Sequence, residues 1–239
     1  MSSLGNETFY QRYGKRVIDL CLSLVLLILF WWVLAIVAIL VRVKLGSPVL
    51  FKQPRPGKDE EIFNLYKFRT MTDECDENGN LLPDEVRLTK FGKALRATSL
   101  DELPEVLNIV RGEMAIIGPR PQLVRDMVFM THEQRKRHRV RPGLSGLAQV
   151  NGRNAIAWDE KLAYDLKYIE RITFTGDVAI FFKTIGNAFV KQEGITEDGM
   201  ATAADYGDYL LAEGRVTREE YDGLQEQAKK LLNEAVVIQ

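Results

Sequence analysis

The most prominent pattern in the chain is an unbroken apolar run near its N-terminus. No residue from Leu20 to Val41 is charged, and Ser23 carries the only hydroxyl group of the run. Roughly 20 such residues form an α-helix long enough to cross the hydrocarbon core of a bilayer. The run is too long for the h-region of a signal peptide, and the following Arg42-Val43-Lys44 offers no small-residue cleavage site. The pattern therefore predicts a membrane-inserted helix.

The orientation of this helix does not follow from its flanks. Lys15 and Arg16 precede the run, and Arg42 and Lys44 follow it. Because basic residues mark the cytoplasmic side of a membrane segment, equal numbers at both ends select no direction. A helix that spans the bilayer and a re-entrant helix, whose two ends return to one face, both remain open.

Beyond the run, the pattern predicts a compact α+β domain that is mainly helical and has a few short strands. Segments 48–51 and 62–69 have the character of strands around a Pro/Gly turn at 54–57, and the polar segment 72–84 is expected to be a surface loop. Helical spacing of apolar residues follows at 89–97, before Gly112, up to residue 130, at 157–171 and at 178–190.

The last part of the chain has a different character and is expected to be an accessory helical hairpin. Two short amphipathic helices meet at Gly214, and Thr217 with Glu220 forms a capping box. The predicted organisation has three parts: the membrane helix with its basic flanks at 1–45, a catalytic domain at 46–203 and the hairpin at 204–239.

Charge and cysteine content exclude several classes of function. The formal net charge is −1, and the basic cluster from Arg135 to Arg141 has no interleaved aromatic residues that could stack on bases. We therefore expect no nucleic-acid partner. Cys21 lies in the apolar run and Cys75 in a polar loop, so neither a disulfide nor a shared metal is expected.

The candidate chemistry lies in the segment from Ser99 to Glu105, where Asp101 and Glu102 are adjacent. A helix is expected to begin here, with Ser99 or Asp101 as its N-cap and Pro104 in its first turn. The exposed N–H groups of a helix start stabilise a carboxylate and also a phosphate brought beside it. Asp101 is therefore a candidate nucleophile toward phosphorus, and an N-cap with ordinary acidic neighbours is the alternative.

Seven ordered motifs between about Tyr13 and Ala203 resemble the bacterial sugar transferases, the small monotopic polyprenol-phosphate phosphoglycosyl transferases. A narrower likeness, carried by 151–154 and the loop at 73–87, is to the enzymes that begin bacterial protein glycosylation from UDP-diacetamido-bacillosamine. The seven motifs are Lys15–Asp19, Phe51–Gly57, Tyr66–Met71, Leu95–Pro104, Gly118–Pro121, Arg141–Gly146 and Gln149–Asn154.

The resemblance implies transfer of a sugar 1-phosphate from a UDP-N-acetylated sugar to undecaprenyl phosphate, with release of UMP. The reaction would take place at the cytoplasmic face of a bacterial inner membrane, as the first membrane step of glycan assembly. The family is taken to use double displacement, in which a carboxylate attacks the β-phosphorus and the lipid phosphate then attacks the aspartyl-phosphosugar. A covalent relay suits two anionic substrates, because it lets them react in turn.

The resemblance also assigns roles to residues of this chain. Asp101 would be the nucleophile and a ligand of Mg²⁺, which offsets the charge of the diphosphate. Glu102 would be its acid/base partner, or would help to hold the metal and the lipid phosphate. For any one of the cations an ordinary ion pair is the alternative. The expected contacts to phosphate or uridine are Lys67, Arg69, Arg96, Arg120 and Arg153.

One departure from the family concerns the membrane helix. Its relatives usually carry a Ser-Pro pair that breaks the helix, whereas this run has Phe30-Trp31-Trp32 at that place and no proline. We nevertheless expect both ends of the helix on the cytoplasmic side, with the two tryptophans at a membrane–water interface. Two other functions stay open, a membrane-anchored nucleotide-diphosphate hydrolase and a non-catalytic membrane scaffold. The oligomeric state also stays open, a homo-oligomer included.

Overall fold

The computed structural model describes residues 8–152, 156–190 and 205–238 of the chain. It is mainly helical and has two small two-stranded sheets, as expected for the predicted α+β class. The elements in chain order are η1 (Tyr10–Gly14), α1 (Lys15–Leu45), β1 (Leu50–Pro56), η2 (Lys58–Glu60), β2 (Ile62–Phe68), α2 (Asp84–Arg87), α3 (Lys90–Ala97), η3 (Leu100–Glu102), α4 (Glu105–Arg111), β3 (Ala115–Ile117), α5 (Val124–Met127), α6 (His132–Arg135), η4 (Lys136–Arg139), β4 (Gly143–Ser145), α7 (Leu147–Val150), α8 (Trp158–Glu170), α9 (Phe174–Val190), α10 (Tyr206–Ala212) and α11 (Arg218–Ile238).

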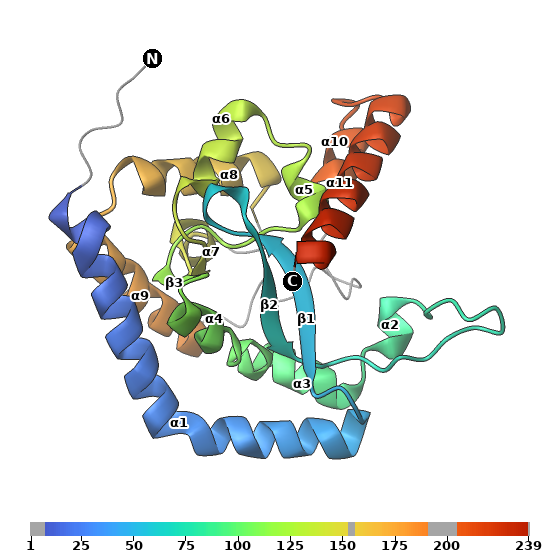
Figure 1. Ribbon diagram of the computed structural model, residues 1–239, viewed down its shortest axis with the longest axis horizontal. Coiled ribbons are helices and arrows are strands. Elements are labelled where there is room, and N and C mark those ends of the chain that lie inside the picture. The colour runs from blue at the N-terminus through green and yellow to red at the C-terminus, as the bar shows by residue number, and fades with distance from the viewer. Residues whose placement is uncertain (1–7, 153–155, 191–204, 239) are drawn as a thin grey trace.

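The hairpin of β1 and β2 is the central feature of the domain (Figure 1). Its antiparallel register pairs Leu50 with Phe68 at one end and Pro56 with Ile62 at the other. The expected turn at 54–57 was wrong, because β1 continues through both prolines and the chain turns only after Gly57. Proline is tolerated there because β1 is an edge strand, whose outer side needs no N–H donor.

The open edge of β2 is held by one buried side chain of α4. Asn108 accepts a hydrogen bond from Tyr66 N at 3.1 Å and donates to Asn64 O at 2.7 Å. It is fully buried, so these bonds satisfy backbone groups that would otherwise be left unpaired. These two hydrogen bonds fix α4 against β2, the strand that carries Lys67.

Two of the seven motifs, Gly118–Pro121 and Arg141–Gly146, meet at the second sheet. β3 and β4 are parallel and pair Ala115 with Gly143 and Ile117 with Ser145. A Cβ atom added at Gly143 would lie 2.1 Å from Gly118 N, so only glycine permits this approach of the two backbones. This contact sets the start of the Gly118–Pro121 segment.

Helix α1 is long and apolar enough to cross a membrane, but it is not straight. Figure 1 shows a marked bend about halfway along it, so that both of its halves lie along the same domain. Arg16, in the first half, donates to the carbonyls of Ile109 and Val110 at the end of α4. Val37 and Val41, in the second half, belong to a buried cluster with Phe68 and Leu95.

The C-terminal hairpin is packed into the main core of the domain. Tyr206, Leu210 and Ala228 are buried with Val124 and Trp158, and the Arg125–Asp205 ion pair of 2.6 Å lies beside them. The backbone N–H of Tyr206 also donates to Asp126 of α5. Helices α10 and α11 therefore support α5, the helix that follows the Gly118–Pro121 segment.

Candidate active site

The acidic pair lies in η3, a single 3₁₀ turn between α3 and α4. The backbone enters this turn through Ser99, which has φ 55° and is thus in the left-handed region that non-glycine residues seldom adopt. The expected cap was wrong, because Pro104 occupies the N-cap position of α4 and neither Ser99 nor Asp101 caps it. The expected stop at Gly112 is confirmed by its φ of 87°.

Asp101 is 8 % exposed, and its surroundings oppose ionisation. Burial raises the pKa of its carboxyl group and the negative charge of Glu102 raises it further, while Lys67 and Arg96 act in the opposite direction. Burial therefore outweighs the stabilisation that we expected from N–H groups at a helix start. Burial has the larger effect here, and a carboxylate so poorly solvated is more basic and more nucleophilic when it does ionise.

Glu102 is held by two cations on one of its oxygens. Its Oε1 accepts from Lys67 Nζ at 2.8 Å and from an Arg120 terminal nitrogen at 2.7 Å. Burial alone would raise the pKa of Glu102, but the charges of Arg120 and Lys67 outweigh it and lower the pKa. Glu102 therefore stays ionised, which argues against its acting as a proton donor.

A third carboxyl group, that of Glu105, was not among the predicted site residues. Its Oε1 lies 3.3 Å from Lys67 Nζ, and its side chain is 3 % exposed. Burial and the nearby charge of Glu102 raise the pKa of Glu105 to about 7. Its position four residues after Asp101, one helical turn away, was the available signal.

Arg120 is positioned by contacts with the backbone around it. Arg137 donates to the Arg120 carbonyl at 2.5 Å and forms a fully buried ion pair with Asp165. Arg55 donates to the next carbonyl, that of Pro121, at 3.1 Å. Arg137 is buried and Arg55 is half-buried, and their contacts hold the backbone of the loop between β3 and α5 from which Arg120 reaches Glu102.

The remaining predicted contacts are distributed unevenly. Arg96 donates to Thr70 Oγ1 at 3.1 Å, and its positive charge acts on Asp101. Arg69 donates to the carbonyls of Leu45 at 2.7 Å and Ser47 at 2.8 Å, so its guanidinium completes the end of α1. Arg153 lies outside the described residues. Lys67, Arg96 and Arg120 thus lie around the acidic pair, whereas Arg69 forms hydrogen bonds with backbone carbonyls at the end of α1.

The acidic pair also lies next to α1. Leu100 and Leu103, on either side of the pair, pack against the buried cluster that contains Val37 and Val41. The second half of α1 therefore forms part of the support for Asp101. This contact places the candidate nucleophile close to the apolar helix α1.

Within the described ranges, no group of three or more His, Cys, Asp or Glu side chains could hold a metal ion by itself. Mg²⁺ usually takes only one or two protein carboxylates and completes its shell with water and substrate phosphate. Asp101 fits this limited role, because the ion pairs of Lys67 and Arg120 in the described part of the chain go to Glu102 and Glu105. The donor set is therefore compatible with the expected Mg²⁺ in the presence of a diphosphate.

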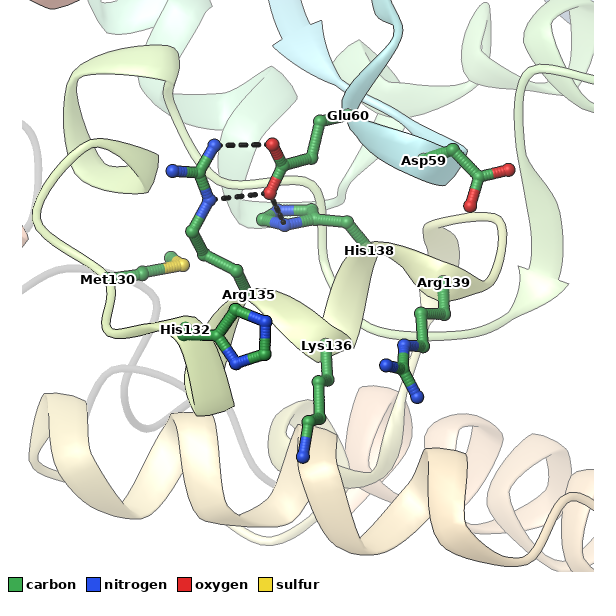
Figure 2. Close-up of a pocket in the computed structure, with 8 residues that line it drawn as sticks. All are labelled: Asp59, Glu60, Met130, His132, Arg135, Lys136, His138 and Arg139. Atoms are coloured by element: carbon green, nitrogen blue, oxygen red, sulfur yellow. Dashed lines mark hydrogen bonds and ion pairs between the residues drawn. The ribbon is translucent and has the colours of Figure 1, made fainter. Parts of the chain in front are cut away.

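A pocket elsewhere on the domain holds a second group of charges (Figure 2). Glu60, in η2 between β1 and β2, accepts from Arg135 through both of its oxygens, and His138 Nδ1 lies 3.5 Å from Glu60 Oε1. Burial and the charge of Arg137 lower the pKa of His138 to about 3, so this side chain is neutral near pH 7. The pocket contains none of the residues of the acidic pair.

Comparison with known proteins places the chain in a family. Residues 10–191 match the family of bacterial sugar transferases. The chain is 47% identical over 189 residues to the uncharacterized sugar transferase EpsL of Bacillus subtilis (strain 168), with 79% of this chain and 93% of that protein covered.

Two longer relatives carry more specific names. One is the UDP-glucose:undecaprenyl-phosphate glucose-1-phosphate transferase of Klebsiella pneumoniae, at 35% identity over 74% of this chain and 40% of the relative. The other is the UDP-N-acetylgalactosamine-undecaprenyl-phosphate N-acetylgalactosaminephosphotransferase of Aeromonas hydrophila, at 37% identity over 72% of this chain and 42% of the relative. The chain thus spans less than half the length of these two relatives. Its match over most of its own length shows that it belongs to the bacterial sugar transferase family.

Proposed function

We propose that this protein transfers a sugar 1-phosphate from a UDP-sugar to undecaprenyl phosphate and releases UMP. The observation that carries the proposal is a buried Asp101 beside a Glu102 that Lys67 and Arg120 hold ionised, next to a helix suited to a membrane. The names of the relatives support the same reaction class. A hydrolase would not need its carboxylates packed against a membrane helix, and a scaffold would not need a poorly solvated carboxyl group.

The first step is attack of an Asp101 carboxylate oxygen on the β-phosphorus of the UDP-sugar. A bond forms between the Asp101 oxygen and this phosphorus, and the bond from the phosphorus to the bridging oxygen of UMP breaks. The negative charge that leaves with UMP is offset by Arg120 and Arg96. Lys67 keeps Glu102 in place, so that no second carboxylate competes for the phosphorus.

The second step regenerates the carboxylate. A phosphate oxygen of undecaprenyl phosphate attacks the same phosphorus, the bond to Asp101 breaks, and the product is a lipid-linked sugar diphosphate. Because UMP has already left, the two anionic substrates need not occupy the site together. The packing of Leu100 and Leu103 on α1 supports this step, because it keeps Asp101 where a lipid phosphate can arrive from the bilayer.

A Mg²⁺ ion bound by Asp101 and the diphosphate would supply charge neutralisation for in-line attack. We expect activity to fall below detection in excess chelator and to return on titration with Mg²⁺. Mn²⁺ and Ca²⁺ titrations serve as comparison for ion size. Undiminished rates in chelator would exclude the metal from the proposal.

The decisive test traps the covalent intermediate. Incubation of the detergent-solubilised protein with UDP-sugar alone should add the mass of one phosphosugar to Asp101 and release one equivalent of UMP. Further UMP release should then depend strictly on undecaprenyl phosphate, whereas a hydrolase would continue without the lipid. An adduct on Glu102, or none at all, would contradict the mechanism.

The sugar and the cellular process are finer parts of the proposal. The resemblance favours a UDP-N-acetylated sugar, UDP-diacetamido-bacillosamine among them, and a role in bacterial protein glycosylation. A panel of UDP-sugars in the UMP-release assay separates this from UDP-glucose, the substrate in the name of the Klebsiella relative. A preference for UDP-glucose would contradict the proposed UDP-N-acetylated substrate and would assign the protein to the assembly of another glycan.

The topology we propose has both ends of α1 at the cytoplasmic face. The Lys15–Asp177 ion pair of 2.6 Å binds the start of the helix to the domain that Arg69 binds at the other end. UDP-sugars are cytoplasmic, so this domain belongs on that side. A single cysteine at Ser3, in a Cys21→Ser, Cys75→Ser background, should resist a membrane-impermeant thiol reagent added from the periplasm.

A further inference from the structure

The bend of α1 occurs where the rest of the protein gives no support. From residue 24 to residue 32 the side chains are exposed, with only position 27 intermediate, whereas Val33, Leu34 and Ala38 again pack against the buried cluster of Val37 and Val41. The helix contains no proline, so the usual cause of a kink is missing. The contacts of the two halves with the domain hold the bend from its ends, so local support at the bend itself must come from the exposed segment.

A bend inside a bilayer has a particular difficulty. Helix hydrogen bonds lengthen on the outer side of a kink, and in hydrocarbon no water can bond to the carbonyl groups that turn outward. A proline bends the helix because its ring clashes with the carbonyl four residues earlier, and it lacks the N–H that would bond to that carbonyl. A helix without proline needs another donor at the carbonyl that tilts away.

Trp32 supplies such a donor. Its indole Nε1–H donates to the carbonyl of Leu29 at 2.9 Å. In a regular helix this carbonyl bonds to the N–H of Val33, four residues ahead. A side-chain donor at the same oxygen lets the carbonyl turn outward without losing its partner, which is one of the recognised causes of a kink. Leu29 and Trp32 lie on either side of the midpoint of α1, and Figure 1 shows the helix bending about halfway along its length.

We propose that the Trp32 indole N–H is the group that stabilises the bend of α1, in the role that proline has in other kinked helices. Trp32 is thus a positioning residue, since the bend allows one half of α1 to bind α4 while the other packs behind Asp101. The two neighbouring tryptophans then differ in role. Both side chains are exposed, Trp31 to 65% and Trp32 to 51%, but Trp32 donates its indole N–H to a carbonyl of the helix. This inference rests on the same-side topology proposed above.

The experiment compares Trp32→Phe with Trp31→Phe in the Ser3→Cys, Cys21→Ser, Cys75→Ser background. Both variants keep an aromatic ring and lose one indole N–H, so they are matched in size and hydrophobicity. We expect Trp32→Phe to increase severalfold the fraction of molecules labelled from the periplasm, and to lower UMP release in proportion. Trp31→Phe should leave labelling and activity unchanged.

A second variant tests the proposed cause directly. Val33→Pro removes the backbone N–H that would bond to the Leu29 carbonyl, and its ring pushes that carbonyl outward. Trp32→Phe/Val33→Pro should therefore return labelling to the original level. If Trp32→Phe fails to accumulate, recovery of the protein in the double variant is the supporting result, and its failure in both, with normal Trp31→Phe, contradicts the proposal.

The outcomes also separate this inference from the topology. Equal labelling of Trp32→Phe and Trp31→Phe, with the Ser3 cysteine still protected, would overturn the role of Trp32 and leave the same-side topology standing. Periplasmic labelling of the protein with both tryptophans intact would overturn the topology and this inference together, while lipid-dependent UMP release would still support the proposed reaction.

Discussion

Two groups of charged side chains in this domain each hold a glutamate against an arginine, yet they differ in the groups whose pKa values they shift. In the turn cluster (Glu60, Arg135 and His138), Arg135 engages both oxygens of Glu60, and the histidine beside them stays neutral. In the site cluster (Lys67, Asp101, Glu102, Glu105 and Arg120), two cations share a single oxygen of Glu102.

The difference lies in what remains available for chemistry. The turn cluster is closed, because its carboxylate is satisfied within the protein. In the site cluster the carboxyl groups of Asp101 and Glu105 have raised pKa values, because burial and the charge of Glu102 outweigh the nearby cations. Buried groups with such shifted pKa values are expected where a ligand or a reaction will use them.

The largest expected effect comes from removing the carboxylate of Asp101. Asp101→Asn should lower turnover by on the order of 10⁴-fold or more, because the amide cannot attack phosphorus. Glu102→Gln should leave a weaker but measurable enzyme, since it removes a contact and keeps the nucleophile. Glu60→Gln is the matched control, because it breaks a glutamate–arginine pair of the turn cluster. UMP release per folded molecule measures all three, and full activity in Asp101→Asn would remove the distinction between the clusters.

A smaller effect concerns the change of stability between pH 4.5 and neutral pH. The pKa of Glu105 is raised to about 7 from the ordinary glutamate value of 4.5. The folded protein therefore keeps a proton that the unfolded chain releases, so this contribution is present below pH 4.5 and is lost as the pH rises through 7. Glu105→Gln should flatten this part of the stability profile, measured by thermal unfolding in detergent between pH 4.5 and 8. An unchanged slope would mean that Glu105 is ionised throughout.

The turn cluster should respond in the opposite direction. The pKa of His138 is lowered to about 3 from 6.5. Between these pH values the unfolded chain binds a proton on this histidine and the folded protein does not. Stability should therefore fall as the pH drops from 6.5 toward 3, and His138→Gln should reduce that loss. The same thermal unfolding series measures it, with UMP release at neutral pH expected to stay unchanged. An identical acid profile in the variant would show that other groups govern acid unfolding.

Local patterns predicted the fold class, whereas the cations of the candidate site came from the resemblance to the family. Apolar spacing was sufficient for the membrane helix and for α8, and the order of the motifs grouped Lys67, Arg96 and Arg120 with the acidic pair. Charge alone could not separate Arg69 from these cations, because its carbonyl partners come from the end of α1, more than twenty residues earlier.

The misses have a common cause, which is burial by distant segments. Glu105 becomes a site residue because Lys67 of β2 is brought to it, and the pKa of Asp101 rises because η3 is enclosed by the domain. The strand predicted at 48–51 was too short for a different reason, because an edge strand such as β1 can continue through proline. Such effects depend on which elements meet in space, and one-dimensional periodicity does not record that.

The way in which α4 ends has a consequence for dissecting this protein into parts. Its last carbonyls are completed by Arg16 of the membrane helix, and Arg141 donates to the carbonyl of Gly112 at 2.6 Å. The helix that follows the acidic pair is thus finished by a residue from the anchor itself. The anchor is therefore not an exchangeable module: a chimera that carries a foreign membrane segment would have to supply its own guanidinium at this point before the enzyme domain could fold correctly.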